Sequence, residues 1–133
     1  MEVFKSKFMT CDVDSDNRIY NVKWTIETEK ASVNEFEQWN IELTNIYARY
    51  CYESMLANTK DYKFVILPEQ QEWSVANVFE KFASAGLKKI ALVVADDIFP
   101  QVSLEQFVNE YGKEKITTKY FSSEEEARIW LLN

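Results

Sequence analysis

The chain has 133 residues, the length of one domain, and its 47% hydrophobic residues with only two glycines and two prolines exclude a disordered or linker-rich protein. A net charge of -7 argues against nucleic acid or an anionic membrane as a partner, because both repel an acidic surface. The absence of histidine removes the usual general base at neutral pH, and two cysteines are too few for a disulfide framework or a zinc site.

The first predicted element is a β-hairpin. Residues 19–26 show the two-residue period of a strand with one buried face, and residues 2–13 supply its partner. Between the two strands, residues 14–17 are of the types that stabilise turns by bonding to their own backbone.

The aspartates around this turn resemble the start of a calcium-binding loop. Asp12, Asp14 and Asp16 are spaced two apart, but such a loop also needs a glycine and a final bidentate carboxylate. Asn17 and Lys23 occupy those two positions, and a lysine there would repel the cation. The sequence therefore predicts a structural turn and no metal site.

A helix is predicted from residue 33 to at least residue 47. Ser32 and Glu35 have the spacing of a capping box, in which each side chain accepts a hydrogen bond from the backbone amide of the other residue. Apolar residues then recur at spacings of three and four, which indicates one core-facing stripe, formed by Phe36, Trp39, Leu43, Ile46 and Tyr50.

Two segments compete for the next strand. They are residues 53–58 (ESMLAN) and residues 62–67 (YKFVIL), and propensity alone favours the second. The hydrophobic pattern does not decide between them.

Strands and helices alternate in the rest of the chain. A second helix lies between Pro68 and Gly86, where the glycine is placed as a C-cap, and residues 88–95 form a buried parallel strand. A short helix at 103–111, a strand at 115–121 and a terminal helix at 123–131 complete the order ββαβαβαβα. This order predicts an α/β domain, with a mostly parallel five-stranded sheet begun by an antiparallel hairpin and with helices on its faces.

No constellation of residues predicts catalysis. Asp96 and Asp97 follow a buried strand, where α/β proteins place ligand-binding groups, but the aspartate and lysine that a phospho-receiver site also needs are missing, so we expect two solvated carboxylates. Glycine-rich phosphate loops are absent as well. We expect no enzyme activity, no metal and no cofactor.

The chain also lacks a long apolar run and a signal-peptide pattern, so a cytoplasmic location is predicted.

The order of elements, together with YESMLANTKDYKFVILPEQQEW, DIFPQVSLEQ and YFSSEEEARIWL, resembles the SpoIIAA-like group of the STAS superfamily, and in particular small bacterial STAS-like proteins. The resemblance spans nearly the whole chain and implies a single SpoIIAA-like domain over residues 1–133. It also aligns ESMLAN with the central strand of the family, which favours residues 53–58 over residues 62–67.

The resemblance implies a regulatory protein that acts by docking onto a protein partner, a kinase or an anti-sigma-like protein. In STAS antagonists a kinase phosphorylates a serine or threonine just after the central strand, and the match places Asn58 and Thr59 at that position. A phosphate on Thr59 would add about 1.5 to 2 negative charges. Asn58 stands where the family has aspartate.

If residues 62–67 are not a central strand, their apolar side chains must be buried against another part of the protein or a second chain, because exposing them to water is costly. We expect a lid over the sheet or the centre of a homodimer interface, formed by Phe64, Val65, Ile66, Leu67 and the nearby Trp73. A second function follows from the fold that the resemblance implies, because that fold is similar to one family of lipid-binding domains. The alternative to docking is thus a carrier of a small apolar or lipid-like ligand.

Overall fold

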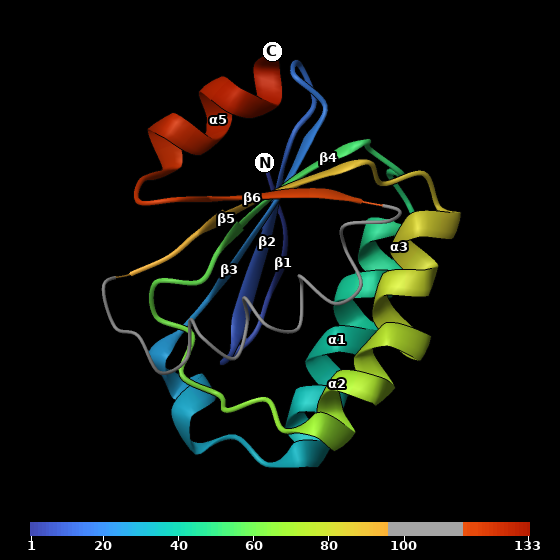
Figure 1. The fold of residues 1–133 in the computed structure, drawn as a ribbon, viewed down its shortest axis with the longest axis vertical. Coiled ribbons are helices and arrows are strands. Elements are labelled where there is room, and N and C mark those ends of the chain that lie inside the picture. The colour runs from blue at the N-terminus through green and yellow to red at the C-terminus, as the bar shows by residue number, and fades with distance from the viewer. Residues whose placement is uncertain (96–115) are drawn as a thin grey trace.

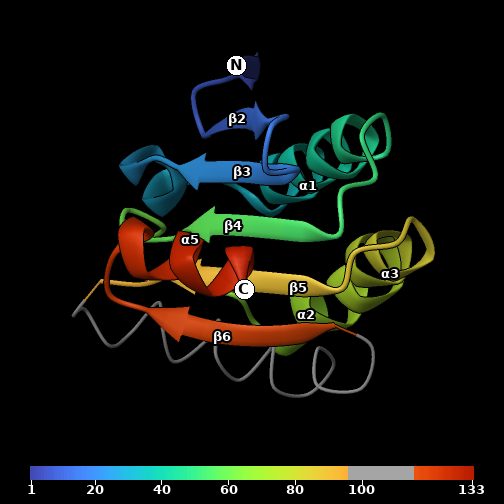
Figure 2. The same cartoon turned by 90° about the horizontal axis from the view of Figure 1, so that it is seen from above.

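A computed structural model describes residues 1–95 and 116–133 of the chain. It contains a mixed sheet of six strands in the order β1 to β6, with helices on both faces (Figures 1 and 2). The strands are β1 (Glu2–Lys5), β2 (Met9–Asp14), β3 (Ile19–Trp24), β4 (Ser54–Asn58), β5 (Lys89–Val93) and β6 (Thr117–Phe121). The helical segments are η1 (Ile26–Lys30), α1 (Val33–Tyr47), α2 (Pro68–Ser74), η2 (Val75–Phe79), α3 (Glu80–Ser84) and α5 (Glu124–Leu132).

The sheet begins antiparallel and continues parallel, as the predicted α/β class requires. β1, β2 and β3 pair antiparallel, and β3 to β6 are parallel neighbours in chain order. The prediction of five strands was one too few, because residues 2–13 form two strands. The hydroxyl of Ser6 accepts hydrogen bonds of 3.2 Å from the amides of both Phe8 and Met9, which turns the chain back on itself.

The capping predictions for the helices are confirmed. Ser32 Oγ accepts from the amide of Glu35 at 3.1 Å, and Glu35 Oε1 accepts from the amide of Ser32 at 2.9 Å. Gly86 follows α3 with a φ of +107°, and the amide of Leu87 bonds to the carbonyl of Phe82 at 3.0 Å. This pairing is the Schellman arrangement that ends a helix.

Of the two candidates for this strand, residues 53–58 contain it and residues 62–67 do not. β4 lies in the middle of the sheet, parallel to both β3 and β5. Residues 62–67 have no regular secondary structure and connect β4 to α2. Propensity therefore favoured the wrong segment, because the buried apolar side chains of residues 62–67 pack against the helices and the sheet without pairing as a strand.

The helices divide between the two faces of the sheet (Figure 2). α1 and the continuous helix formed by α2, η2 and α3 cover one face, and α5 covers part of the other. Right-handed crossovers between successive parallel strands explain why α1 and α2–α3 share a face. The larger core lies under these helices, and the smaller core lies under α5, around Ile19, Leu56, Ala91, Val93, Ala127 and Leu131.

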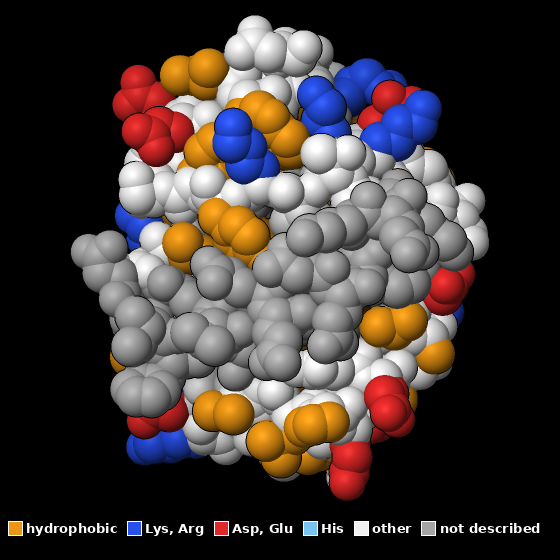
Figure 3. Space-filling model, viewed as in Figure 1, with side chains coloured by type: hydrophobic (Ala, Val, Ile, Leu, Met, Phe, Trp, Pro, Cys, Tyr) orange, Lys and Arg blue, Asp and Glu red, His pale blue; other side chains and the backbone are white. Residues whose placement is uncertain are grey.

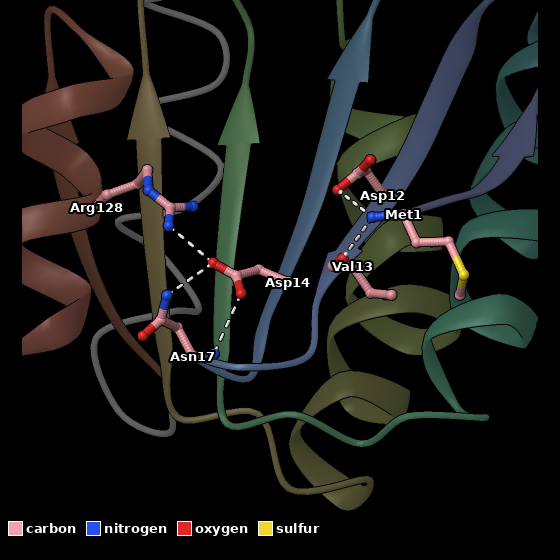
Figure 4. A network of polar contacts seen from close by, with 6 residues as sticks. All are labelled: Met1, Asp12, Val13, Asp14, Asn17 and Arg128. Carbon is pink, nitrogen blue, oxygen red and sulfur yellow. Dashed lines mark hydrogen bonds and ion pairs between the residues drawn. The ribbon is translucent and has the colours of Figure 1, made fainter.

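The predicted turn at residues 14–17 is confirmed. Asp14 accepts hydrogen bonds from the backbone amide and the side-chain amide of Asn17, at 3.2 and 2.9 Å (Figure 4). Arg128 of α5 also donates to Asp14, at 2.7 Å. Asp14 therefore serves as a turn and ion-pair residue. Among the described residues, no three His, Cys, Asp or Glu side chains are grouped so that they could hold a metal ion.

Three features of the predicted pattern lie outside the described residues. They are the acidic pair Asp96–Asp97, the short helix at 103–111 and the stretch DIFPQVSLEQ. In the described ranges, no helix has the length and hydropathy that crossing a bilayer requires.

Candidate ligand-binding cavity

An apolar cavity of about 80 Å³ lies in the larger core, between the sheet and the helices α1 and α2–α3. Of the sixteen described residues that line it, two are tryptophans, eleven are other hydrophobic residues and three are polar. The described lining residues are Trp24, Phe36, Trp39, Asn40, Leu43, Met55, Ala57, Thr59, Tyr62, Ile66, Ser74, Val78, Phe79, Phe82, Ile90 and Leu92.

Two strands of the sheet and two helices supply most of the cavity wall. The inward-facing residues of β4 and β5 form its floor, because alternate residues of a strand point to the same face. α1 contributes residues at positions 36, 39, 40 and 43, which the helical repeat places on one side. The helix that runs from Pro68 to Ser84 closes the opposite wall.

The middle of this second helix is a π-helical segment, η2. The amide of Glu80 bonds to the carbonyl of Val75, five residues earlier, where an α-helix would use the residue four earlier. Val78 and Phe79 of this segment line the cavity, and Ser74 directly precedes it. Single π-helical turns within α-helices occur frequently at functional sites.

Residues 62–67 close one end of the cavity with alternate side chains. Tyr62, Phe64 and Ile66 are buried, and Tyr62 and Ile66 contact the cavity directly. Val65 and Leu67 point outward and are 57% and 56% exposed. Tyr62, Phe64 and Ile66 thus form an inner row and Val65 and Leu67 an outer row, so four of the five residues of the predicted lid or interface divide between the two rows.

Trp73, the fifth residue of that predicted group, is half-buried and lies outside the cavity lining. Its ring is 5.9 Å from that of Phe36, which stacks on Phe64 at 4.6 Å. Trp73 thus contacts the inner row indirectly, through Phe36.

The polar groups of the cavity wall are few and uncharged. Asn40 Nδ2 donates to the carbonyl of Phe36 at 2.9 Å, and the Thr59 hydroxyl donates to the carbonyl of Val93 at 2.9 Å. Burial raises the pKa of Tyr62 above that of an ordinary tyrosine, so its phenol stays neutral. No Asp, Glu, Lys or Arg is among the described lining residues.

The indole N–H groups of Trp24 and Trp39 are the exception to this pattern of satisfied polar groups. Both nitrogens are buried, and neither has a hydrogen-bond partner among the described residues. The rings lie against Tyr62 in edge-to-face contacts, with centroid distances of 5.3 and 6.1 Å. Both indole rings thus contact the same cavity residue, Tyr62.

Of the two predicted switch residues, Asn58 ends β4 and Thr59 directly follows it, and both are buried, at 6% and 4% exposure. Asn58 Nδ2 donates to Glu124 Oε2 of α5 at 2.5 Å, and its Oδ1 accepts from the amide of Lys60. Both the amide and the hydroxyl of Thr59 bond to the carbonyl of Val93. These contacts give both residues a structural role at the carboxyl end of β4.

On the face seen in Figure 3, the described hydrophobic side chains lie in small separate groups.

Comparison of the chain with family models, curated proteins and solved structures finds no match. Sequence reasoning placed Trp24 on a strand and Trp39 on a helix stripe but did not identify them as cavity residues. The available signal was that a buried tryptophan usually needs a partner for its N–H group.

Proposed function

We propose that the protein is a non-enzymatic binding protein that takes a small, largely apolar and neutral molecule into this cavity. The observation that carries the proposal is an apolar cavity whose wall includes two buried N–H donors without acceptors. Well-packed interiors contain few voids larger than a water molecule, and pockets for small molecules combine apolar walls with few polar groups. The neutral lining disfavours a charged ligand, because burying an unpaired charge is costly.

The volume of the cavity limits the ligand in the described conformation. At about 80 Å³ it is roughly half the size of an apolar cavity of about 150 Å³ that holds benzene. A long lipid chain does not fit this space. Of the two ligand classes that the sequence suggested for a carrier, small apolar and lipid-like, the proposal therefore favours the small apolar molecule.

Xenon is a suitable first probe, because it enters apolar cavities and needs no hydrogen bond. We expect xenon to shift the NMR signals of cavity residues such as Met55 and Ile90. Ala57→Val should reduce those shifts by filling the cavity, and Ala76→Val, on the exposed side of η2, is the matched control. Equal xenon binding by the wild type and Ala57→Val, or no shift in either, would contradict the proposal.

The SpoIIAA-like identity, docking onto a protein partner and the phosphorylation switch stay predictions. The Thr59 hydroxyl is bonded to Val93, so a kinase could modify it only after local opening of this strand end. The homodimer prediction now depends on the outer row. If it is right, Leu67→Asp should lower self-association in sedimentation experiments, and Glu69→Lys, at a nearby exposed position, should not.

A further inference from the structure

The two unpartnered indoles say more about the ligand than the apolar wall does. Trp24 is 9% exposed and Trp39 is 1% exposed, so water at the surface does not satisfy their N–H groups. A buried donor left without an acceptor is destabilising, and native proteins leave few such groups. Two of them at one cavity indicate a missing acceptor.

The neighbouring polar groups do not provide that acceptor. Asn40, Thr59 and Ser74 also line the cavity, but neither indole nitrogen is within hydrogen-bonding geometry of an acceptor among the described residues. Tyr62 contacts both indoles through its ring. Among the described residues, the acceptor for Trp24 and Trp39 is therefore absent.

We infer that the ligand is a neutral carbonyl compound, with a compact apolar body and an oxygen that accepts hydrogen bonds from Trp24 and Trp39. This inference rests on the proposed function. The apolar body fits the aliphatic and aromatic wall, and the carbonyl oxygen, with two lone pairs, serves both donors. A carboxylate is excluded because no cationic side chain among the described lining residues would balance its charge.

The test compares acetone with isobutene, which have the same shape and differ in whether an oxygen or a methylene group ends the double bond. The chain has four tryptophans, so its indole N–H signals in an NMR spectrum report the contact directly. We expect acetone to move the Trp24 and Trp39 signals downfield. The signals of Trp73 and Trp130, which lie outside the cavity lining, serve as internal controls.

Acetone should also bind at least about fivefold more tightly than isobutene, because each hydrogen bond to an indole N–H contributes about that ratio. Trp39→Phe should reduce this preference, and Trp130→Phe, on the other face of the sheet, should retain it. If Trp39→Phe does not fold, the indole N–H signals of the wild type still show whether acetone accepts hydrogen bonds from Trp24 and Trp39.

The outcomes separate this inference from the proposed function. Equal binding of both probes without a downfield shift of either indole signal would overturn the carbonyl inference and leave the cavity as a binding site. Binding of neither acetone, isobutene nor xenon would overturn both. A bound water that acetone does not displace would also overturn the carbonyl inference.

Discussion

Arg128 of α5 donates a hydrogen bond of 2.7 Å to Asp14 at the end of β2, although 114 residues separate them. Asn17 and Arg128 together hold the pKa of the Asp14 carboxyl at about 2, below its usual value, because both hydrogen-bond to its charged form. Asp14 therefore links the first hairpin to the last helix (Figure 4).

Asp14→Asn should lower the free energy of unfolding at pH 7, and the difference from the wild type should shrink at low pH. A carboxylate with a lowered folded pKa stabilises above its unfolded pKa of about 4 and loses that effect as the pH falls through 2. Urea unfolding between pH 2 and 7 measures this. Asp16→Asn, at an exposed position of the same turn, is the control. A constant difference across the range would contradict the assignment.

Ile66→Ala and Leu67→Ala should differ strongly in stability, although the residues are neighbours of similar size. Ile66 is 6% exposed and lines the cavity, so its truncation should cost about 2 to 5 kcal/mol. Leu67 is 56% exposed, and its truncation should cost less than about 0.5 kcal/mol. Denaturant unfolding compares the two variants, and equal losses would show that the chain does not alternate as described.

The two cysteines should differ in reactivity. Burial raises the pKa of Cys11 to about 11, and Cys51 is exposed. Because the thiolate is the reactive form, a thiol reagent at pH 8 should modify Cys51 rapidly and Cys11 only on unfolding. Cys51→Ser should remove the fast phase, and a fast reaction that persists in this variant would contradict the burial of Cys11.

Gly86→Ala should destabilise the protein by about 1 to 2 kcal/mol, through the backbone alone. The φ of +107° is unfavourable for a residue with a side chain, yet an added Cβ would meet no atom within 4 Å. Thermal unfolding measures the loss, and Ser84→Ala, at an exposed position of the same helix end, is the control. An unchanged stability would argue against the Schellman arrangement.

Local signals in the sequence predicted most of the fold. The capping box at Ser32 and Glu35, the turn around Asp14 and the glycine after α3 each act through neighbours within a few residues, so their types and spacing were informative. The break between β1 and β2 was missed because Ser6 makes the turn without glycine, proline or asparagine.

The cavity could not be predicted from the sequence. Each lining residue looks like an ordinary core residue, and the space between them depends on how strands, helices and residues 62–67 pack together. The π-helical form of η2 and the missing acceptors for Trp24 and Trp39 depend on the same packing. Pattern and propensity describe single elements and give no account of the fit between them.

The π-helical segment η2 also bears on how a ligand could enter. Its hydrogen bonds span five residues, whereas those of the helical turns before and after it span four, so the segment is a place where the helix can change register without melting. Pro68 at one end and Gly86 at the other fix where the helix starts and stops. The helix beside the cavity can therefore rearrange by a local shift of its backbone hydrogen bonds, while its two ends at Pro68 and Gly86 stay in place.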